Sequence, residues 1–294
     1  MKNPSAGLHQ SSTPRCAPPN PQSLVITGAS GGLGLALARH YLERGAIVAA
    51  IARRGELLQT LAAEFPDRIY CYALDVRDAS AMQDAACDFI ARVGVPDVVI
   101  ANAGVSVGTL TDYAEDLEAF QQVMDINVLG MVKTFQPFLS AMRANSSPEV
   151  VQAGNPRSGC SHKGRLGGVL VGIASVAGFR GLPGAGAYSA SKAAAITYLE
   201  SLRVELRGSG IKVVTICPGY IRTPMTAVNP YAMPFILDAE EAARRIARAI
   251  ERQTAFSVIP WQMGWIGCLL KLLPRRLYDR LFANAPRKPR GRLP

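Results

Sequence analysis

The chain has 294 residues, 49% of them hydrophobic, and a net charge of +10. A chain of this length forms one large domain or two small ones, and none of its apolar stretches is long enough to cross a membrane or to serve as a secretory signal. Its six cysteines are scattered without a Cys-x-x-Cys pair, which is typical of reduced thiols in a cytoplasmic protein and argues against a disulfide framework.

The positive charge lies outside the main body of the chain. Residues 271–294 carry a net charge of +7, residues 1–22 and 145–168 carry +2 each, and the remainder carries −1. This distribution, together with the lack of a recognition motif, argues against a nucleic-acid-binding protein. Cys160 and His162 are close in sequence, but two potential ligands do not make a metal site, so we expect no bound metal.

Short apolar segments alternate with amphipathic ones along most of the chain. Residues 1–22, rich in Pro, Ser, Asn and Gln, are expected to form a disordered tail. Strands are expected at Leu24–Thr27, Ile47–Ile51, Ile69–Ala73, Asp97–Ala101, Val169–Ile173, Lys212–Cys217 and Phe256–Ile259. Helices are expected at Leu35–Arg44, Glu56–Glu64, Ser80–Val93, within Leu117–Ala144, at Tyr188–Arg207 and at Ala239–Gln253. The alternation predicts an α/β fold over residues 23–260: a Rossmann-like, doubly wound, seven-stranded parallel sheet with helices on both faces.

Two local features accompany this pattern. Residues 145–168 form a polar stretch that is longer than the usual helix-to-strand connection, and we expect an inserted surface loop there. Asp238 and Glu241 have the spacing of a capping box at the start of the last of these helices.

A glycine-rich turn follows the first strand. Gly28, Gly32 and Gly34, with Ser30 among them, lie between a buried type of strand and a helix. Glycines allow the backbone to approach a pyrophosphate closely, and the helix N-terminus supplies N–H donors. A strand, glycine turn and helix in this order predict a dinucleotide-binding site.

Ser175, Tyr188 and Lys192 form a second motif. The serine precedes the tyrosine by thirteen residues and the lysine follows it by four, so Tyr188 and Lys192 share one face of the expected helix. A nearby ammonium favours the phenolate and would lower the tyrosine pKa from about 10 toward neutrality. The pair would then act as a general acid/base, with the serine hydroxyl holding a carbonyl oxygen. Taken alone, Tyr-x-x-x-Lys also arises by chance.

Together the two motifs resemble those of the short-chain dehydrogenase/reductase family in its compact single-domain form, from about Ser23 to Pro260. The resemblance implies a catalytic set of Asn127, Ser175, Tyr188 and Lys192, in which the asparagine holds a water in a proton relay. It implies cofactor contacts from Gly28, Ser30, Gly32, Gly34, Arg53, Asp75, Val76, Asn102, Gly104, Tyr188, Lys192, Pro218, Gly219 and Thr223. One position departs from the family pattern, because Ala101 stands where the family has an asparagine.

The resemblance also implies a reaction, namely hydride transfer between a nicotinamide cofactor and a ketone or secondary alcohol. Ser175 would bind the substrate oxygen, Tyr188 would exchange its proton, and Lys192 would tune the tyrosine and bind the nicotinamide ribose. A homo-oligomer is expected of this fold. The alternative is a catalytically silent nucleotide-binding scaffold or sensor, against which the intact catalytic set argues.

The end of the second strand favours NADP(H) over NAD(H). Relatives specific for NAD usually carry an acidic residue at the position of Ala52, where it binds the ribose hydroxyls. Here Arg53 and Arg54 follow Ala52, and an arginine there can bind a 2′-phosphate. Two solvated arginines at a strand end are the alternative.

Apolar side chains recur in Met225–Leu237, the loop expected to close over the substrate: Met225, Val228, Tyr231, Met233, Phe235, Ile236 and Leu237. They predict a hydrophobic substrate, with packing on the body of the protein as an equal alternative.

Residues 261–294 form an amphipathic and basic extension that begins with Trp261 and Trp265. Four apolar residues are spaced to form one helical stripe: Ile266, Leu270, Leu273 and Leu277. Pro274 is expected to bend this helix. Either the stripe packs on the body or on a neighbouring subunit, or the extension lies peripherally at the inner face of the cytoplasmic membrane.

Overall fold

The structure is a computed structural model that describes residues 23–146 and 167–291. The expected tail at 1–22 lies outside the described residues. So does most of the expected insertion at 145–168, which includes Cys160 and His162.

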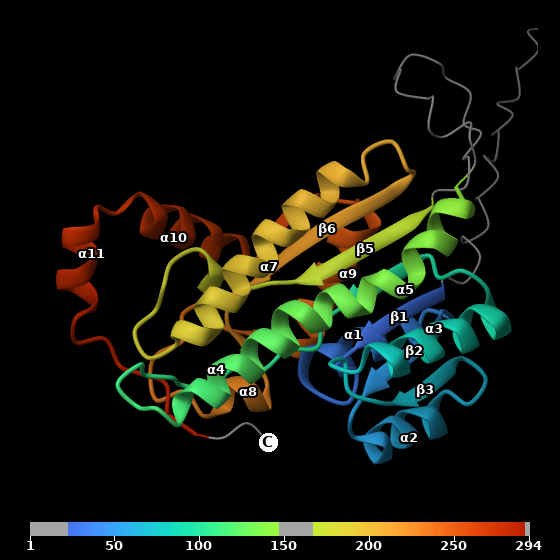
Figure 1. Cartoon of the computed structure of the whole chain (residues 1–294), viewed down its shortest axis with the longest axis horizontal. Helices are drawn as coiled ribbons and strands as arrows, with labels where there is room; N and C mark the ends of the chain where they lie inside the picture. The colour runs from blue at the N-terminus through green and yellow to red at the C-terminus, as the bar shows by residue number, and fades with distance from the viewer. Residues whose placement is uncertain (1–22, 147–166, 292–294) are drawn as a thin grey trace, which may run out of the picture.

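A seven-stranded parallel sheet runs through the centre of the molecule (Figure 1). Its strands are β1 (Ser23–Thr27), β2 (Ile47–Ala52), β3 (Ile69–Ala73), β4 (Val98–Ala101), β5 (Gly168–Ile173), β6 (Ile211–Pro218) and β9 (Phe256–Ile259). They pair in the order β3-β2-β1-β4-β5-β6-β9. Most of these strands are apolar runs because helices cover both faces of the sheet. The expected Rossmann-like α/β fold and all seven expected strands are confirmed.

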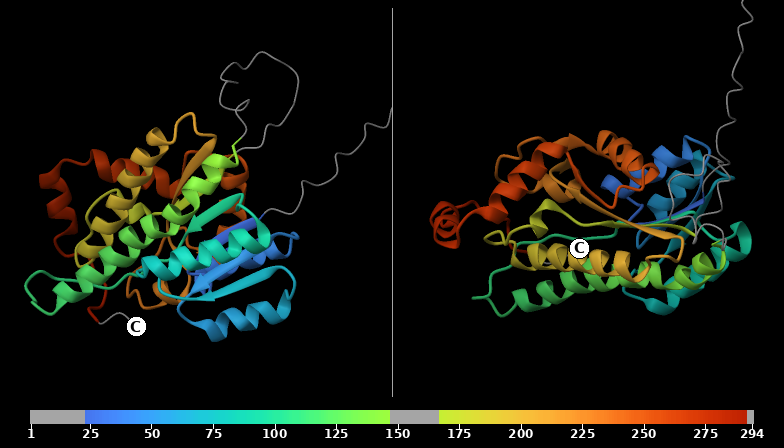
Figure 2. Two further views of the ribbon diagram at one scale, coloured as in Figure 1. Left: turned by 45° about the vertical axis from the view of Figure 1, so that its right-hand side comes forward. Right: turned by 90° about the horizontal axis from the view of Figure 1, so that it is seen from above.

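Two helical layers cover the sheet (Figure 2). One consists of α1 (Gly32–Leu42), α2 (Gly55–Glu64) and α9 (Ala239–Glu251), and the other of α3 (Ala79–Val93), α5 (Gly130–Ala144) and α7 (Gly186–Glu205). Because successive strand residues face opposite ways, Leu24 and Ile26 of β1 join the first core and Val25 joins the second. The sheet is thus held from both faces, and its strand ends are fixed relative to one another.

The segment expected to contain one helix, Leu117–Ala144, contains two. α4 (Asp116–Met124) and α5 are joined by a π-helical turn, Asp125–Leu129, in which Ile126 and Asn127 are buried. A π turn holds one more residue than an α turn, and such turns are frequent at functional sites.

The capping box expected at Asp238 and Glu241 is wrong, although Asp238 is the N-cap of α9. Two short strands, β7 (Ile221–Arg222) and β8 (Leu237–Asp238), pair in parallel and set Arg222 opposite Asp238. The aspartate carboxylate therefore accepts a hydrogen bond from Arg222 Nε at 2.8 Å instead of capping the helix. The same pairing joins the two ends of the loop at 223–236, which begins with the short helix α8 (Pro224–Ala227).

The C-terminal extension forms two helices, α10 (Trp261–Leu272) and α11 (Arg275–Phe282), separated at Pro274. Ile266, Leu270 and Leu273 of the expected stripe are half-buried, whereas Leu277 is exposed. These helices pack on the loop that precedes α7. Phe179 of that loop lies so close to α10 that a Cβ on Gly267 would overlap its ring, and the Tyr278 hydroxyl donates to the Gly181 carbonyl. Most of the stripe therefore packs on the body. No helix in the described part of the chain is long and apolar enough to cross a membrane.

Candidate active site

The expected catalytic residues meet at the carboxyl edge of the sheet. Ser175 follows β5, Tyr188 and Lys192 lie in the first two turns of α7, and Asn127 lies in the π turn that faces that helix. Ligands of open parallel sheets bind at this edge, where the strand order reverses direction, which here is between β1 and β4.

Ser175 is held at the start of a 3₁₀ turn, Val176–Gly178, where its hydroxyl accepts a hydrogen bond from the Ala177 N–H at 3.1 Å. It also donates to the Pro218 carbonyl at 3.4 Å, which is a long and therefore weak bond. The Ser175 side chain also lies close enough to Tyr188 to oppose the rise of the tyrosine pKa that burial causes. The serine hydroxyl thus points to the tyrosine.

Lys192 is buried beneath Tyr188. Its Nζ donates to the Ile173 carbonyl at 2.8 Å and lies 5.8 Å from the centroid of the tyrosine ring. Removal of the ammonium from water lowers the pKa of Lys192 to about 8. Burial raises the pKa of Tyr188, and the Ser175 side chain opposes that rise. Burial of the phenol thus opposes the lowering of the tyrosine pKa that the motif predicts.

Asn127 braces the loop that follows β4. Its Oδ1 accepts the Val105 N–H at 2.8 Å, and its Nδ2 donates to the Val105 carbonyl at 3.0 Å and to Ser191 Oγ at 2.9 Å. The side-chain amide is fully buried and fully bonded. Gly104 lies beside it, where a Cβ would be 3.1 Å from Asn127 Oδ1 and 3.5 Å from Lys192 Nζ.

The glycine turn has the geometry of a pyrophosphate site. Gly28 and Gly32 have φ of +71° and +53°, which glycine adopts without strain, and a Cβ on Gly34 would overlap the Gly28 carbonyl. The N-cap of α1 is Gly31, which has no side chain to occupy the first N–H groups of the helix. A bare backbone and an uncapped helix N-terminus fit a dinucleotide phosphate.

The segment after β6 lies between the serine and this turn. The Pro218 carbonyl accepts the Ser175 bond, and the Gly219 N–H donates to the Ile259 carbonyl at 2.8 Å. Thr223 caps α8, and its methyl group lies 3.2 Å from the place of a Cβ on Gly32. The structure therefore brings both motifs to one site, as the sequence predicts.

Known proteins with the same arrangement are numerous. The family profile described as short chain dehydrogenase matches residues 22–232. An uncharacterised oxidoreductase of Myxococcus xanthus is 37% identical over 261 residues, which cover 88% of this chain and 95% of that protein. The 2-dehydro-3-deoxy-L-rhamnonate dehydrogenase (NAD(+)) of a Sphingomonas strain is 32% identical over 68% of this chain and 72% of that protein. A crystal structure of a short chain dehydrogenase from Burkholderia cenocepacia in complex with NADP superposes with a TM-score of 0.72 at 26% identity, over 89% of this chain and 97% of that one.

The chain belongs to the short-chain dehydrogenase/reductase family. It is therefore an NAD(P)-dependent oxidoreductase of the class that acts on CH–OH groups.

Three further positions that the family resemblance implicates in cofactor binding have protein partners in this dehydrogenase. Asn102 Nδ2 donates to the Thr27 carbonyl at 2.9 Å, directly under the glycine turn. Arg77 forms a bidentate contact with Asp75, with Nη2 2.7 Å from Oδ2, and these hydrogen bonds hold the pKa of the carboxyl below its ordinary value. Val76 is buried against Gly130. The adenine contacts of Asp75 and Val76 stay predictions.

Arg54 lies closer to the glycine turn than the sequence alone indicates. Its Nη2 donates to Ser30 Oγ at 3.2 Å, so the guanidinium spans from the end of β2 to the turn that follows β1. Arg53 is close enough to Asp75 to add to the lowering of its pKa that Arg77 produces. Both arginines therefore flank the adenosine end of the expected cofactor site.

Residues at the other end of the site could not be predicted from the sequence. Lys288 and Arg290 belong to the basic extension, yet Lys288 Nζ lies 3.0 Å from Ser106 Oγ, in the loop braced by Asn127. The sequence contains no signal for this contact. The segment around Lys288, between Pro286 and Pro289, has no hydrophobic periodicity from which its packing could be predicted.

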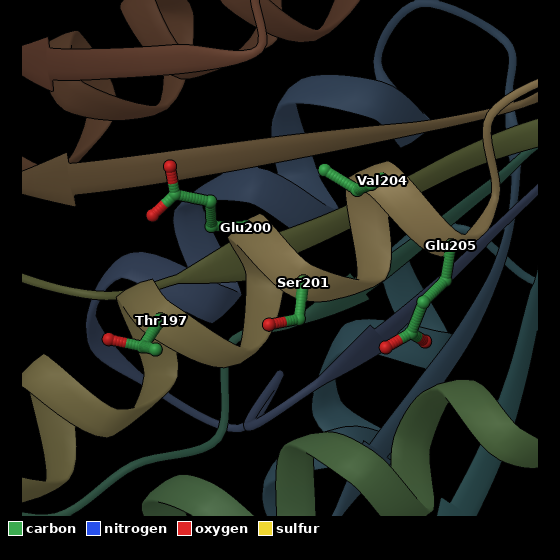
Figure 3. A pocket seen from close by; sticks show the side chains of 5 residues that line it. All are labelled: Thr197, Glu200, Ser201, Val204 and Glu205. Atoms are coloured by element: carbon green, nitrogen blue, oxygen red, sulfur yellow. The ribbon is translucent and has the colours of Figure 1, made fainter.

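An open hollow on the outer face of α7 lies away from these residues (Figure 3). It is lined by Thr197, Glu200, Ser201, Val204 and Glu205. Thr197 is nine residues beyond Tyr188, or about 13 Å along a helix. The hollow contains none of the expected catalytic or cofactor residues. Nor does the described part of the chain group three His, Cys, Asp or Glu side chains as metal ligands.

Proposed function

We propose that the protein is an NADP(H)-dependent reductase of ketones, or dehydrogenase of the corresponding secondary alcohols, with a hydrophobic substrate. The observation that carries the proposal is the convergence of Ser175 and Tyr188 at the buried ammonium of Lys192, which lies 5.8 Å from the centroid of the tyrosine ring. These groups can hold a carbonyl oxygen, give it a proton and stabilise the charge left behind.

The bound nicotinamide supplies or accepts the hydride. In the reductive direction, Ser175 donates a hydrogen bond to the substrate oxygen and Tyr188 transfers its proton to that oxygen as the carbonyl carbon gains the hydride. The products are the alcohol and the tyrosinate of Tyr188, whose charge the Lys192 ammonium stabilises. Because burial raises the pKa of Tyr188, the phenol is protonated at neutral pH and ready to act as the acid. Asn127 positions the loop at Val105 and the start of α7, and we assign it the proton relay that the family resemblance implies.

Preference for NADP(H) rests on the end of β2. Ala52 offers no carboxylate for the ribose hydroxyls, and Arg54 reaches Ser30 of the glycine turn. A guanidinium at this place can bind a 2′-phosphate through charge-assisted hydrogen bonds. The family does not decide the cofactor, because the Burkholderia structure contains NADP and the Sphingomonas relative is named for NAD(+).

A hydrophobic substrate is supported by the loop between β7 and β8. Met225, Val228 and Phe235 are exposed there, although apolar side chains that served only to pack would be covered. Burial raises the pKa of the half-buried Tyr231, and Tyr220 and Tyr188 add to that rise, so the loop lies near the catalytic tyrosine.

The test is NADPH consumption by the purified full chain against neutral ketones graded by chain length. We expect turnover that rises with apolar chain length. Binding of NADPH, seen as quenching of protein fluorescence, without turnover of any ketone or oxidation of any secondary alcohol would instead identify the silent scaffold or sensor.

We also propose a homo-oligomer. Apolar side chains are exposed on the outer faces of the helices α4 and α7, among them Leu117, Phe120 and Val204. A second copy that packed on this layer would cover them.

We further propose that α10 and α11 attach the protein peripherally to the anionic, cytoplasmic face of the membrane. Trp261, Trp265, Leu269 and Leu272 are spaced four, four and three residues apart, and each exposes between 65% and 80% of its surface. This face of α10 is distinct from the expected stripe, which packs on the body. Both helices project from one end of the molecule (Figures 1 and 2).

Charge distinguishes a membrane from a second copy of the chain as the occupant of this face. Across residues 261–282 the charged side chains are Lys271, Arg275, Arg276, Asp279 and Arg280, a net charge of +3. A twofold contact would bring this charge against itself. An anionic lipid surface attracts it, and tryptophan is enriched at membrane interfaces.

A further inference from the structure

The chain returns to the active site after α11. Residues 284–290, which we call the strap, run back to the loops on both sides of the catalytic helix. The Pro289 carbonyl accepts the Gly108 N–H at 3.1 Å, and Arg287 packs on Gly184. Lys288 Nζ donates to Ser106 Oγ at 3.0 Å and to the Met225 carbonyl at 3.3 Å.

Arg290 anchors the end of the strap. Its Nε and Nη2 donate to Asp116 Oδ2 and Oδ1 at 2.8 and 3.1 Å, and Nη2 also donates to Glu115 Oε1 at 3.1 Å. The guanidinium lies over the ring of Tyr113. Asp116 is buried and also accepts the Leu110 N–H, so it is fixed before the arginine reaches it. A bidentate pair with a buried, preoriented carboxylate is stronger than an ordinary surface ion pair.

Two glycines make room for the strap. A Cβ on Gly108 would overlap the Lys288 and Pro289 carbonyls, and a Cβ on Gly184 would lie 2.8 Å from that of Arg287. Gly184 has a φ of +72°, which disfavours any other residue. The loops that receive the strap are therefore shaped for its backbone.

The strap spans the approach to Tyr188. Ser106 is next to Val105, which Asn127 braces, and Thr109 Oγ1 accepts the N–H of Ala187, the neighbour of Tyr188. On the other side, Met225 lies in α8, just after Thr223. Lys288 thus joins the loop after β4, which Asn127 braces beside the catalytic helix, to α8.

The ammonium of Lys288 has no acidic partner within the described part of the chain, where its bonds go to a hydroxyl and a carbonyl. It is half-buried, and burial lowers the pKa of Lys288. A partly desolvated cation without a counter-charge is unfavourable unless a ligand supplies one. An ammonium has three donors, so one remains for that ligand.

We propose that Lys288 binds a carboxylate on the substrate, so that the substrate is a keto acid whose apolar chain separates the ketone from the carboxylate. This inference rests on the proposed function and narrows it. The apolar loop at 225–237 contacts the chain of the substrate and Lys288 its charged end, which makes Lys288 a specificity-determining residue rather than a catalytic one.

The experiment uses a keto acid and its methyl ester, at the chain length that the neutral panel favours and with saturating NADPH. The native enzyme should prefer the acid. Lys288→Met should lower kcat/KM for the acid at least tenfold, because KM rises. It should leave kcat/KM for the ester within twofold of the native value. Retained activity on the ester also shows that the variant is folded. Lys288→Arg should retain most of the preference, because it keeps the charge. Arg280→Met, which removes a charge from α11, is the matched control and should change neither value.

Equal loss for acid and ester in Lys288→Met would overturn the proposal, because Lys288 would then only hold the strap. So would a native enzyme that reduces the ester as well as the acid. If the native enzyme binds NADPH but reduces neither compound, the proposed function itself is refuted. This outcome differs from the two above, because in both of those the native enzyme reduces the ester.

Discussion

Burial acts in opposite directions on the two ionisable side chains of the catalytic helix. It raises the pKa of the Tyr188 phenol and lowers that of the Lys192 ammonium, because each loses its charged form more readily away from water. As for Tyr188, burial raises the pKa of the nearby Cys217 thiol, to about 12. Cys217 therefore carries no thiolate at neutral pH and is a core thiol, as the apolar strand around it predicts.

Tyr188→Phe should lower kcat by at least 100-fold and leave the Kd for NADPH nearly unchanged, because only the proton transfer is removed. Tyr198→Phe, on the same helix, is the control. In the native enzyme, ketone reduction should decline and alcohol oxidation should rise as the pH increases through the tyrosine pKa, since the phenol is the acid and the phenolate the base. Retention of more than a tenth of native turnover in Tyr188→Phe would show that another group is the acid.

Lys192→Met should stabilise the cofactor-free protein at pH 7. A shift of the pKa from 10.5 to about 8 corresponds to about 3 kcal/mol of destabilisation while the lysine is charged. Loss of the bond to the Ile173 carbonyl offsets part of the gain. The folded native protein binds fewer protons than the unfolded chain between pH 8 and 10.5, so its stability rises with pH in that window and the advantage of the variant shrinks.

Urea denaturation at several pH values measures this difference in unfolding free energy. Lys212→Met, which removes an exposed lysine from β6, should show no such pH dependence. A native protein that is more stable than Lys192→Met at every pH would show that the ammonium is not desolvated as the structure indicates.

Elements with a strong apolar pattern could be predicted from the sequence, and those fixed by tertiary contacts could not. β2 and β4 are uninterrupted apolar runs and β1 is apolar between Ser23 and Thr27, so their position and parallel order follow from the pattern and the helices between them. The π turn at Asp125–Leu129 leaves no local signature, because it depends on how α4 and α5 each pack. The pairing of Arg222 with Asp238 depends on two strands of two residues each, and the capping-box prediction failed for that reason.

The residues at the end of β2 are expected to determine the choice between NADPH and NADH. Ala52→Asp combined with Arg53→Ala should shift kcat/KM from NADPH toward NADH by at least tenfold, because a carboxylate there binds ribose hydroxyls and repels a 2′-phosphate. Arg54→Ala should raise KM for NADPH alone, since its guanidinium reaches Ser30. Initial rates with both cofactors measure this, with Arg68→Ala as a control. Equal kcat/KM values for NADH and NADPH in the native enzyme would contradict the preference.

At the scale of the whole molecule, the extension is part of the site. α10 packs on Phe179, α11 bonds to Gly181, and the strap reaches Ser106, so residues 261–290 cover the connection between Ser175 and Tyr188. The convergence of Ser175, Tyr188 and Lys192 could be predicted because their spacing is local to one helix and one strand end. The docking of the extension could not, because its partners are glycines, backbone carbonyls and side chains of distant loops, which no pattern in the extension itself specifies.

The enclosure of the site also decides how membrane attachment is tested. Truncation at Pro260 would remove the strap along with α10, so exposed side chains are changed instead. We expect the full chain to float with vesicles of phosphatidylglycerol and phosphatidylcholine and not with phosphatidylcholine alone, and to be released by salt, because basic residues near anionic headgroups contribute about 1 kcal/mol each.

Trp265→Ser combined with Leu269→Ser should lose flotation and retain turnover, whereas Leu117→Ser, similarly exposed on α4, should float as the native protein does. Equal recovery of native protein and double variant with anionic vesicles would refute the attachment. A change of sedimentation coefficient in the double variant without any flotation of the native protein would instead identify a second copy of the chain as the occupant of this face.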